Sequence, residues 1–153
     1  MRFLLRVPVP WVFVLAFLVG AGLQRLFPFP AWPAQALRIG RIAGFVLLAT
    51  GAAFASWSLL IFHRARTTTT PGETSEALVT WGPYRLSRNP MYVSLTLAYV
   101  GEAGILAQAW PLLVLPLVVA YLNQIVIPLE EARLWEAFRE RYEEFSGKVR
   151  RWI

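Results

Sequence analysis

The chain has 153 residues, and 57% of them are hydrophobic, which is more apolar surface than one soluble domain of this size can bury. It has no cysteine and one histidine, His63, so disulfides and thiolate nucleophiles are excluded and no metal site is expected. The formal net charge is +6, but the basic residues lie between and after apolar segments, without interleaved exposed aromatics, so no nucleic-acid partner is expected.

Four apolar segments of 17 to 21 residues predict membrane-spanning helices, at about 11–27, 42–62, 91–109 and 110–127. Each helix would be roughly 26–32 Å long, which matches the hydrocarbon core of a bilayer. Helices are expected because open strands leave backbone groups without partners in lipid. The third and fourth segments nearly touch, and Gly101, Glu102 and Gly104 are an alternative position for the turn between them.

The distribution of basic residues predicts the orientation in the membrane. Twelve of the fifteen Lys and Arg residues lie in the N-terminal segment, the 63–90 loop or the C-terminal tail, and the other three are Arg25, Arg38 and Arg41. The twelve are Arg2, Arg6, Arg64, Arg66, Arg85, Arg88, Arg133, Arg139, Arg141, Lys148, Arg150 and Arg151. Because basic residues concentrate on the cytoplasmic side, both termini and the 63–90 loop are expected in the cytoplasm.

The segments outside the spans belong to the same domain, which covers residues 1–153. The 63–90 loop is long for a connection in so small a protein, and long loops are often functional. In the tail, apolar residues recur at spacings of three and four between Glu and Arg residues. This pattern predicts an amphipathic helix over 129–147, at the membrane interface or folded back on the bundle. The expected fold is therefore an all-α integral membrane bundle of about four transmembrane helices plus this amphipathic helix.

One group of residues suited to binding runs from Gly82 to Tyr92, directly before and into the third apolar segment. Asn89 is a good N-cap, and Pro90 suits the first position of a helix. The free N–H groups and positive dipole end of such a helix can bind a carboxylate or phosphate, and Arg85 and Arg88 strengthen that interpretation. The alternative is an ordinary helix cap with arginines that serve only membrane orientation.

A second group is Glu130 and Glu131, at the end of the fourth apolar segment. Carboxylates at a membrane boundary are costly unless they are paired or used. Alternatively, they favour the first turn of the tail helix, where negative charge meets the positive dipole end. Both groups are expected on the same side of the membrane, so their arginines and carboxylates can converge.

Together the two groups carry a resemblance to a known family. The pattern Gly82-Pro83-Tyr84-Arg85-x-x-Arg88-Asn89-Pro90-x-Tyr92, followed about forty residues later by Glu130-Glu131, resembles the isoprenylcysteine carboxyl methyltransferase and phospholipid methyltransferase superfamily, in its small prokaryotic type. The Thr67–Pro71 stretch, the aromatic residues of the tail and the final segment 149–153 are similar too, so the resemblance covers roughly residues 63–153.

The resemblance implies an enzyme of a prokaryotic cytoplasmic membrane that uses S-adenosylmethionine and releases S-adenosylhomocysteine. It implies a lipophilic or lipid acceptor, such as an isoprenoid carboxylate or thiol or a phospholipid amine, which receives the methyl group by direct in-line transfer. Carried over residue by residue, the cofactor-binding candidates are Tyr84, Arg88, Asn89, Pro90, Tyr92, Glu130, Glu131 and Tyr142. Arg88 and Glu131 are the candidates for the catalytic residues. Asn89 stands where the eukaryotic carboxyl methyltransferases have His, so a proton-handling role of that His is not expected here.

Two other classes of protein are weighed against this interpretation. A small four-helix transporter usually needs an ionisable residue inside a span, and the first two predicted spans carry only Arg25, near an end. A membrane scaffold would leave the two groups of residues without a role. A homodimer through the small residues Gly20, Gly22, Gly44 and Gly51 is a further possibility, and membrane lipids are the expected surroundings.

Overall fold

A computed structural model describes residues 8–29, 33–65 and 77–153, and all regular structure over these ranges is helical. The Thr67–Pro71 stretch of the sequence pattern and the basic residues Arg2, Arg6 and Arg66 lie outside the described residues. The elements in chain order are α1 (Val9–Leu26), α2 (Ala34–Ala65), a 3₁₀ turn (Gly82–Arg85), α3 (Pro90–Ile105), α4 (Ala109–Tyr121), a π-helical turn (Leu122–Val126), α5 (Ile127–Phe138) and α6 (Glu140–Lys148).

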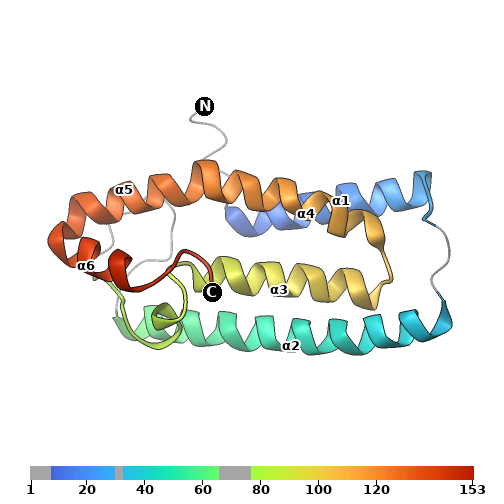
Figure 1. Ribbon diagram of the computed structural model, residues 1–153, viewed down its shortest axis with the longest axis horizontal. Coiled ribbons are helices and arrows are strands. Elements are labelled where there is room, and N and C mark those ends of the chain that lie inside the picture. The colour runs from blue at the N-terminus through green and yellow to red at the C-terminus, as the bar shows by residue number, and fades with distance from the viewer. Residues whose placement is uncertain (1–7, 30–32, 66–76) are drawn as a thin grey trace.

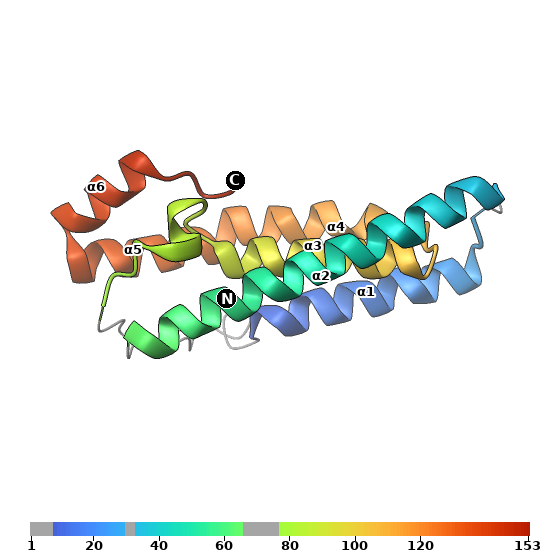
Figure 2. The same ribbon diagram turned by 90° about the horizontal axis from the view of Figure 1, so that it is seen from below.

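The helices form an elongated bundle in which α2 packs closely along α3, and α1 along α4 (Figure 1). The π-helical turn joins α4 to α5, so that Ala109–Phe138 is one continuous helix of 30 residues. At one end of the bundle, α6 folds back and the C-terminal segment returns toward the start of α3 (Figures 1 and 2). This end contains every residue of the candidate site.

Among the described residues, three helices are long and apolar enough to span a membrane: Val9–Leu26, Ala34–Arg64 and Ala109–Phe138. The predicted third span, 91–109, corresponds to α3, which has 16 residues and is about 24 Å long. The fourth predicted span and the beginning of the predicted tail helix are parts of the same long helix. Large apolar side chains are exposed on these helices. Leu18, for example, is 61% exposed, and Leu117 is 71% exposed. Since water would make this exposure costly, lipid must cover these faces, and the chain is an integral membrane protein.

The close packing of α2 on α3 depends on glycines that face each other. A β-carbon on Gly101 would lie 2.7 Å from the carbonyl oxygen of Gly44, which is closer than a side chain can approach. Gly104 makes the same kind of contact with Gly40, at 2.9 Å. The alternative that placed the turn at Gly101–Gly104 is therefore wrong, because these residues lie inside α3, and the connection to α4 is formed by residues 106–108.

The small residues that were considered for a homodimer are largely used inside the chain. A β-carbon on Gly20 would lie 2.6 Å from the Cα atom of Pro111, and one on Gly51 would lie 2.8 Å from the carbonyl oxygen of Ser94. A β-carbon on Gly22 would have no neighbouring atom within 4 Å. The face of α1 that carries Gly20 and the face of α2 that carries Gly44 and Gly51 are thus both occupied within the chain.

The predicted amphipathic helix over 129–147 is wrong in one respect, because the helix breaks at Arg139. This residue has φ 48° and ψ −121°, which ends α5 and starts α6 in a new direction. The change of direction buries Tyr142 and Phe145 in a cluster with Ile61 of α2 and Leu78. A straight helix would carry these two rings away from the bundle, so the burial of aromatic surface offsets the unfavourable backbone conformation of Arg139.

Candidate functional site

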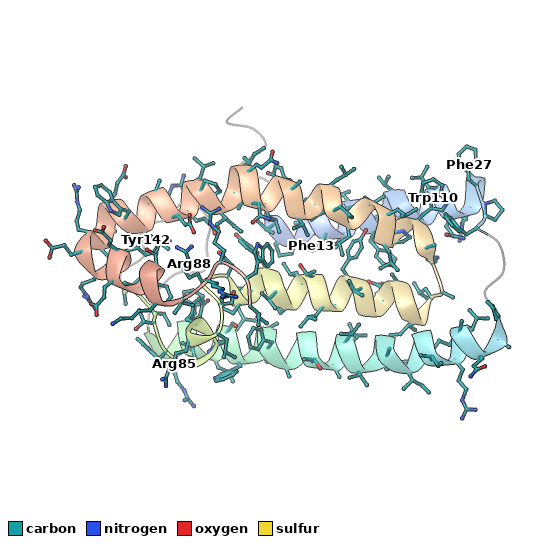
Figure 3. The ribbon with its side chains drawn as sticks, in the orientation of Figure 1. Phe13, Phe27, Arg85, Arg88, Trp110 and Tyr142 are labelled. Atoms are coloured by element: carbon teal, nitrogen blue, oxygen red, sulfur yellow. The ribbon has the colours of Figure 1, made fainter. Side chains whose placement is uncertain are left out.

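The segment before α3 is a compact turn that fixes the direction of its arginines. Gly82 has φ +65°, and a β-carbon there would meet the side chain of Ile61, so glycine is required both by the backbone and by the space. Pro83 and Tyr84 are buried in the turn. As a result, Arg88 points into the molecule toward Tyr142, whereas Arg85 points outward and is exposed (Figure 3).

Arg88, Glu131 and Tyr142 meet although they come from three separate elements. Nη1 of Arg88 lies 3.2 Å from Oε1 of Glu131 and donates a hydrogen bond of 3.3 Å to the Tyr142 hydroxyl. The side chains of Arg88 and Glu131 are only 15% and 17% exposed. The structure thus brings together three of the residues that the sequence pattern predicted for the site.

A residue that the sequence analysis did not select completes this cluster. The guanidinium of Arg151 forms two hydrogen bonds to Glu131, from Nε to Oε1 at 2.9 Å and from Nη2 to Oε2 at 2.6 Å. This hydrogen-bonded pairing raises the pKa of Arg151 above its ordinary value, so the group stays positively charged. The Glu131 carboxylate therefore lies between two guanidinium groups.

The start of α3 is held by the C-terminal segment. Asn89 is the N-cap residue and Pro90 the first residue of α3, as predicted, but the Asn89 side chain makes no capping bond. Instead, Nδ2 of Asn89 and Oγ of Ser87 both donate to the carbonyl oxygen of Arg151, at 3.1 and 2.8 Å. The backbone N–H of Arg88 donates to the carbonyl oxygen of Arg150, at 2.8 Å.

Glu130 has a different partner from Glu131. The hydroxyl of Tyr92 donates a hydrogen bond of 2.6 Å to Oε1 of Glu130, which links the first turns of α3 and α5. Tyr84 lies in the same region, where burial and, to a lesser extent, the negative charge of Glu130 raise the pKa of its hydroxyl above the ordinary value. Tyr84 therefore remains a neutral hydrogen-bond donor in this buried environment.

Two features of the cluster suit an anionic or zwitterionic ligand. Nε of Arg88 is buried and has no hydrogen-bond acceptor among the described residues, although a buried guanidinium N–H normally has one. Burial, followed in size by the Glu131 charge, raises the pKa of Tyr142, so its hydroxyl remains protonated. The site thus combines a buried cation with a free donor, a paired carboxylate and neutral tyrosine hydroxyls.

The structure places all eight candidate residues at this end of the bundle, and Pro90 is the first residue of α3. The sequence analysis missed Arg151 and Ser87, which contact Glu131 and Asn89. Arg150 and Arg151 follow an amphipathic helix, and in the sequence they are equivalent basic neighbours. Only the fold distinguishes them, because Arg150 is exposed and Arg151 faces Glu131.

A separate cavity of about 210 Å³ lies between the N-terminal half of α2 and the C-terminal half of α3, with Leu112 of α4 also on its wall. Its lining is almost entirely apolar, and none of the predicted site residues contributes to it. The lining residues that belong to α3 lie near its C-terminal end, whereas Arg88 precedes its first residue. The cavity and the polar cluster are therefore distinct features. Among the described residues, no group of three or more His, Cys, Asp or Glu side chains is placed to hold a metal ion.

Comparison with known proteins gives one match. The model of the phospholipid methyltransferase family matches residues 39–141, which is more than half of the chain. The matched range includes the Gly82–Tyr92 segment and both glutamates, and it ends one residue before Tyr142. Neither the search of curated proteins nor the search of solved structures finds a match.

Proposed function

The chain belongs to the phospholipid methyltransferase family, and we propose that it transfers a methyl group from S-adenosylmethionine to a lipid-soluble acceptor at the cytoplasmic face of the membrane. The observation that carries this proposal is the cluster of Arg88, Glu131 and Tyr142, which lies where the long apolar helices meet polar segments. The family match supports a membrane methyltransferase, and the cluster supports a cofactor site at this end of the bundle.

The residues present fit the cofactor. Arg88 offers a buried Nε donor that has no acceptor among the described side chains, and a carboxylate would supply one. The methionine part of S-adenosylmethionine carries a carboxylate, so Arg88 is the residue proposed to hold it. Glu131 or Glu130 would accept hydrogen bonds from the ribose hydroxyls or the amino group, and Tyr84, Tyr92 and Tyr142 would line the adenine or face the sulfonium.

The proposed mechanism is a direct in-line transfer in which the protein orients the reactants. When bound, the cofactor supplies a methyl group on a positively charged sulfur, which is reactive enough to transfer without a metal ion. The work of the chain is therefore to hold donor and acceptor in line and to exclude water. Arg88 and Glu131 are fixed by mutual pairing at low exposure, which suits a preorganised binding site.

The acceptor proposed is a molecule that reaches the site through the lipid phase. Candidates are an isoprenoid carboxylate or thiol, the amine of a phospholipid head group, and a small hydrophobic thiol. The exposed apolar faces of α1, α2 and α4 place lipid directly around the bundle, so such a molecule can arrive laterally. Membrane lipids are thus the proposed partners, in a prokaryotic cytoplasmic membrane with both termini on the cytoplasmic side. The family match counts against the alternatives of a transporter or a scaffold without catalysis.

Transfer of label from methyl-labelled S-adenosylmethionine into the organic extract tests the proposal. The full chain is incorporated into vesicles that contain phospholipid, with and without added isoprenoid carboxylate or thiol. We expect label in the lipid fraction that depends on one acceptor class and is lost in Arg88→Ala. Labelled S-adenosylmethionine added outside the vesicles should be used only by protein molecules whose cytoplasmic side faces outward. If a folded protein that binds the cofactor transfers label to none of these acceptor classes, the result would contradict a transferase with these substrates.

A further inference from the structure

The C-terminal segment Val149–Trp152 makes contacts that neither the family match nor the sequence pattern assigns to the site. The family match ends at residue 141, and the eight residues predicted for the site end at Tyr142. Yet Arg151 binds both oxygens of Glu131, whereas Arg88 reaches only Oε1, at 3.2 Å. A paired guanidinium and carboxylate of this kind fixes the plane of the carboxylate as well as its position.

The segment that carries Arg151 is itself held at several points. The carbonyl oxygens of Arg150 and Arg151 accept hydrogen bonds from the turn before α3. The indole N–H of Trp152 donates a hydrogen bond of 2.8 Å to Oδ1 of Asn123, which lies in the π-helical turn between α4 and α5. These contacts tie the Arg88 turn to the α4–α5 helix, because one short segment bonds to both.

The exposure of the three charged side chains shows how they are arranged. Arg151 is 40% exposed, against 15% for Arg88 and 17% for Glu131, so Arg151 lies on the solvent side of the carboxylate. Without Arg151, Arg88 would be the only cation paired with Glu131 among the described residues. The Arg88 guanidinium would then pair with both oxygens of Glu131, and its Nε would be less available to a ligand.

We propose that Arg151 is a positioning residue of the cofactor site, which orients Glu131 and thereby leaves Arg88 free to bind the cofactor carboxylate. This inference rests on the proposed function. Arg151 itself need not touch the cofactor, because its effect passes through Glu131 and through the backbone bonds of its segment to residues 87–89.

Calorimetric titration of the detergent-purified full chain with S-adenosylhomocysteine tests this role. We expect Arg151→Ala to weaken the affinity by about tenfold or more, since a bidentate ionic pair is lost. Arg151→Lys should fall between the wild type and Arg151→Ala, because it keeps the charge without the fork. Added guanidinium ion at low concentration should restore part of the affinity of Arg151→Ala, which a merely structural defect would not allow.

Arg150→Ala is the matched control, since it removes an equal charge from the neighbouring position while the carbonyl that receives the Arg88 N–H stays in place. Its affinity should equal that of the wild type. Hydrogen exchange without ligand gives a second readout, and the Arg88 amide should exchange faster in Arg151→Ala. Unchanged or tighter binding by Arg151→Ala would overturn this inference alone, and tighter binding would mean that the segment obstructs the site. A folded wild type that does not bind would contradict the proposed function, and with it the role of Arg151.

Discussion

Tyr92 and Glu130 form a hydrogen bond of 2.6 Å between the first turn of α3 and the first turn of α5. The next residue, Glu131, faces Arg88 and Arg151 instead. Two consecutive carboxylates therefore have different environments, one with a neutral hydroxyl donor and one between two cations. This difference is why Glu131 is the stronger candidate for the role in cofactor binding.

Replacing Tyr92 by Phe should destabilise the protein by about 1–3 kcal/mol, because Glu130 loses its hydroxyl donor at a site of low exposure. Thermal unfolding in detergent measures the change. Glu130→Gln is the companion variant, since its amide oxygen can still accept the Tyr92 hydrogen bond. An unchanged unfolding midpoint in Tyr92→Phe would show that the bond contributes nothing to stability.

Replacing Gly101 by Leu should destabilise the bundle, because its side chain would have to displace the backbone of α2 at Gly44. Overpacking of this kind typically costs about 1–3 kcal/mol and occasionally more. Gly22→Leu is the matched control, since a β-carbon at that position would meet nothing within 4 Å. Equal unfolding midpoints for the two variants would contradict the close contact of α2 and α3.

Replacing Arg139 by Gly should stabilise the protein. The φ of 48° with ψ of −121° is unfavourable for a side chain by about 1–3 kcal/mol, and glycine removes that strain. The loss of the Arg139 contact with the Trp135 ring, 4.6 Å from its centroid, costs about 0.5–1 kcal/mol at an exposed position, which is the smaller effect. Arg141→Gly, in the first turn of α6, should instead destabilise the protein, by at most about 1 kcal/mol. If both glycine variants lower the chemical-denaturation midpoint, the break at Arg139 is not where the structure places it.

Stability should fall at alkaline pH because of the buried tyrosines. The pKa values of Tyr84 and Tyr142 are raised in the folded protein, mainly by burial, so the unfolded chain releases these protons first as the pH rises. The stability associated with the neutral hydroxyls is fully present below the ordinary tyrosine pKa of about 10 and is lost above it. Unfolding midpoints from about pH 8 to about pH 11 measure the effect, which should be smaller in the Tyr84→Phe, Tyr142→Phe double variant. A pH dependence identical to that of the wild type would refute this origin.

The sequence predicts the parts of this molecule that depend on local pattern. The apolar segments give an all-helical membrane bundle, and the Asn89–Pro90 pair places the beginning of α3 correctly. Arg88 and Glu131 are far apart in the sequence, but both are predicted on the same side of the membrane. The sequence is therefore also consistent with their contact.

The features that the sequence does not predict depend on contacts between distant elements. Arg139 breaks the tail because Tyr142 and Phe145 gain a buried position against α2 and the loop, and the spacing of apolar residues in the tail is the same in both arrangements. From the sequence alone, Gly101 and Gly104 favour a turn. The structure shows instead that they allow α3 to pack closely against Gly44 and Gly40 of α2. Arg151 differs from Arg150 solely in the direction that the folded segment gives it.

Binding of S-adenosylmethionine and S-adenosylhomocysteine to the detergent-purified protein tests the central claim most directly. Calorimetry should show binding by the wild type and its loss in Arg88→Ala and Glu131→Ala, with each variant confirmed as folded by its elution and unfolding profile. Arg85→Ala is the matched control, because Arg85 points out of the molecule, and it should bind as the wild type does (Figure 3). A cofactor site built on Arg88 and Glu131 would be contradicted by a folded wild type that binds neither compound. It would also be contradicted if Arg88→Ala and Glu131→Ala bound as tightly as Arg85→Ala.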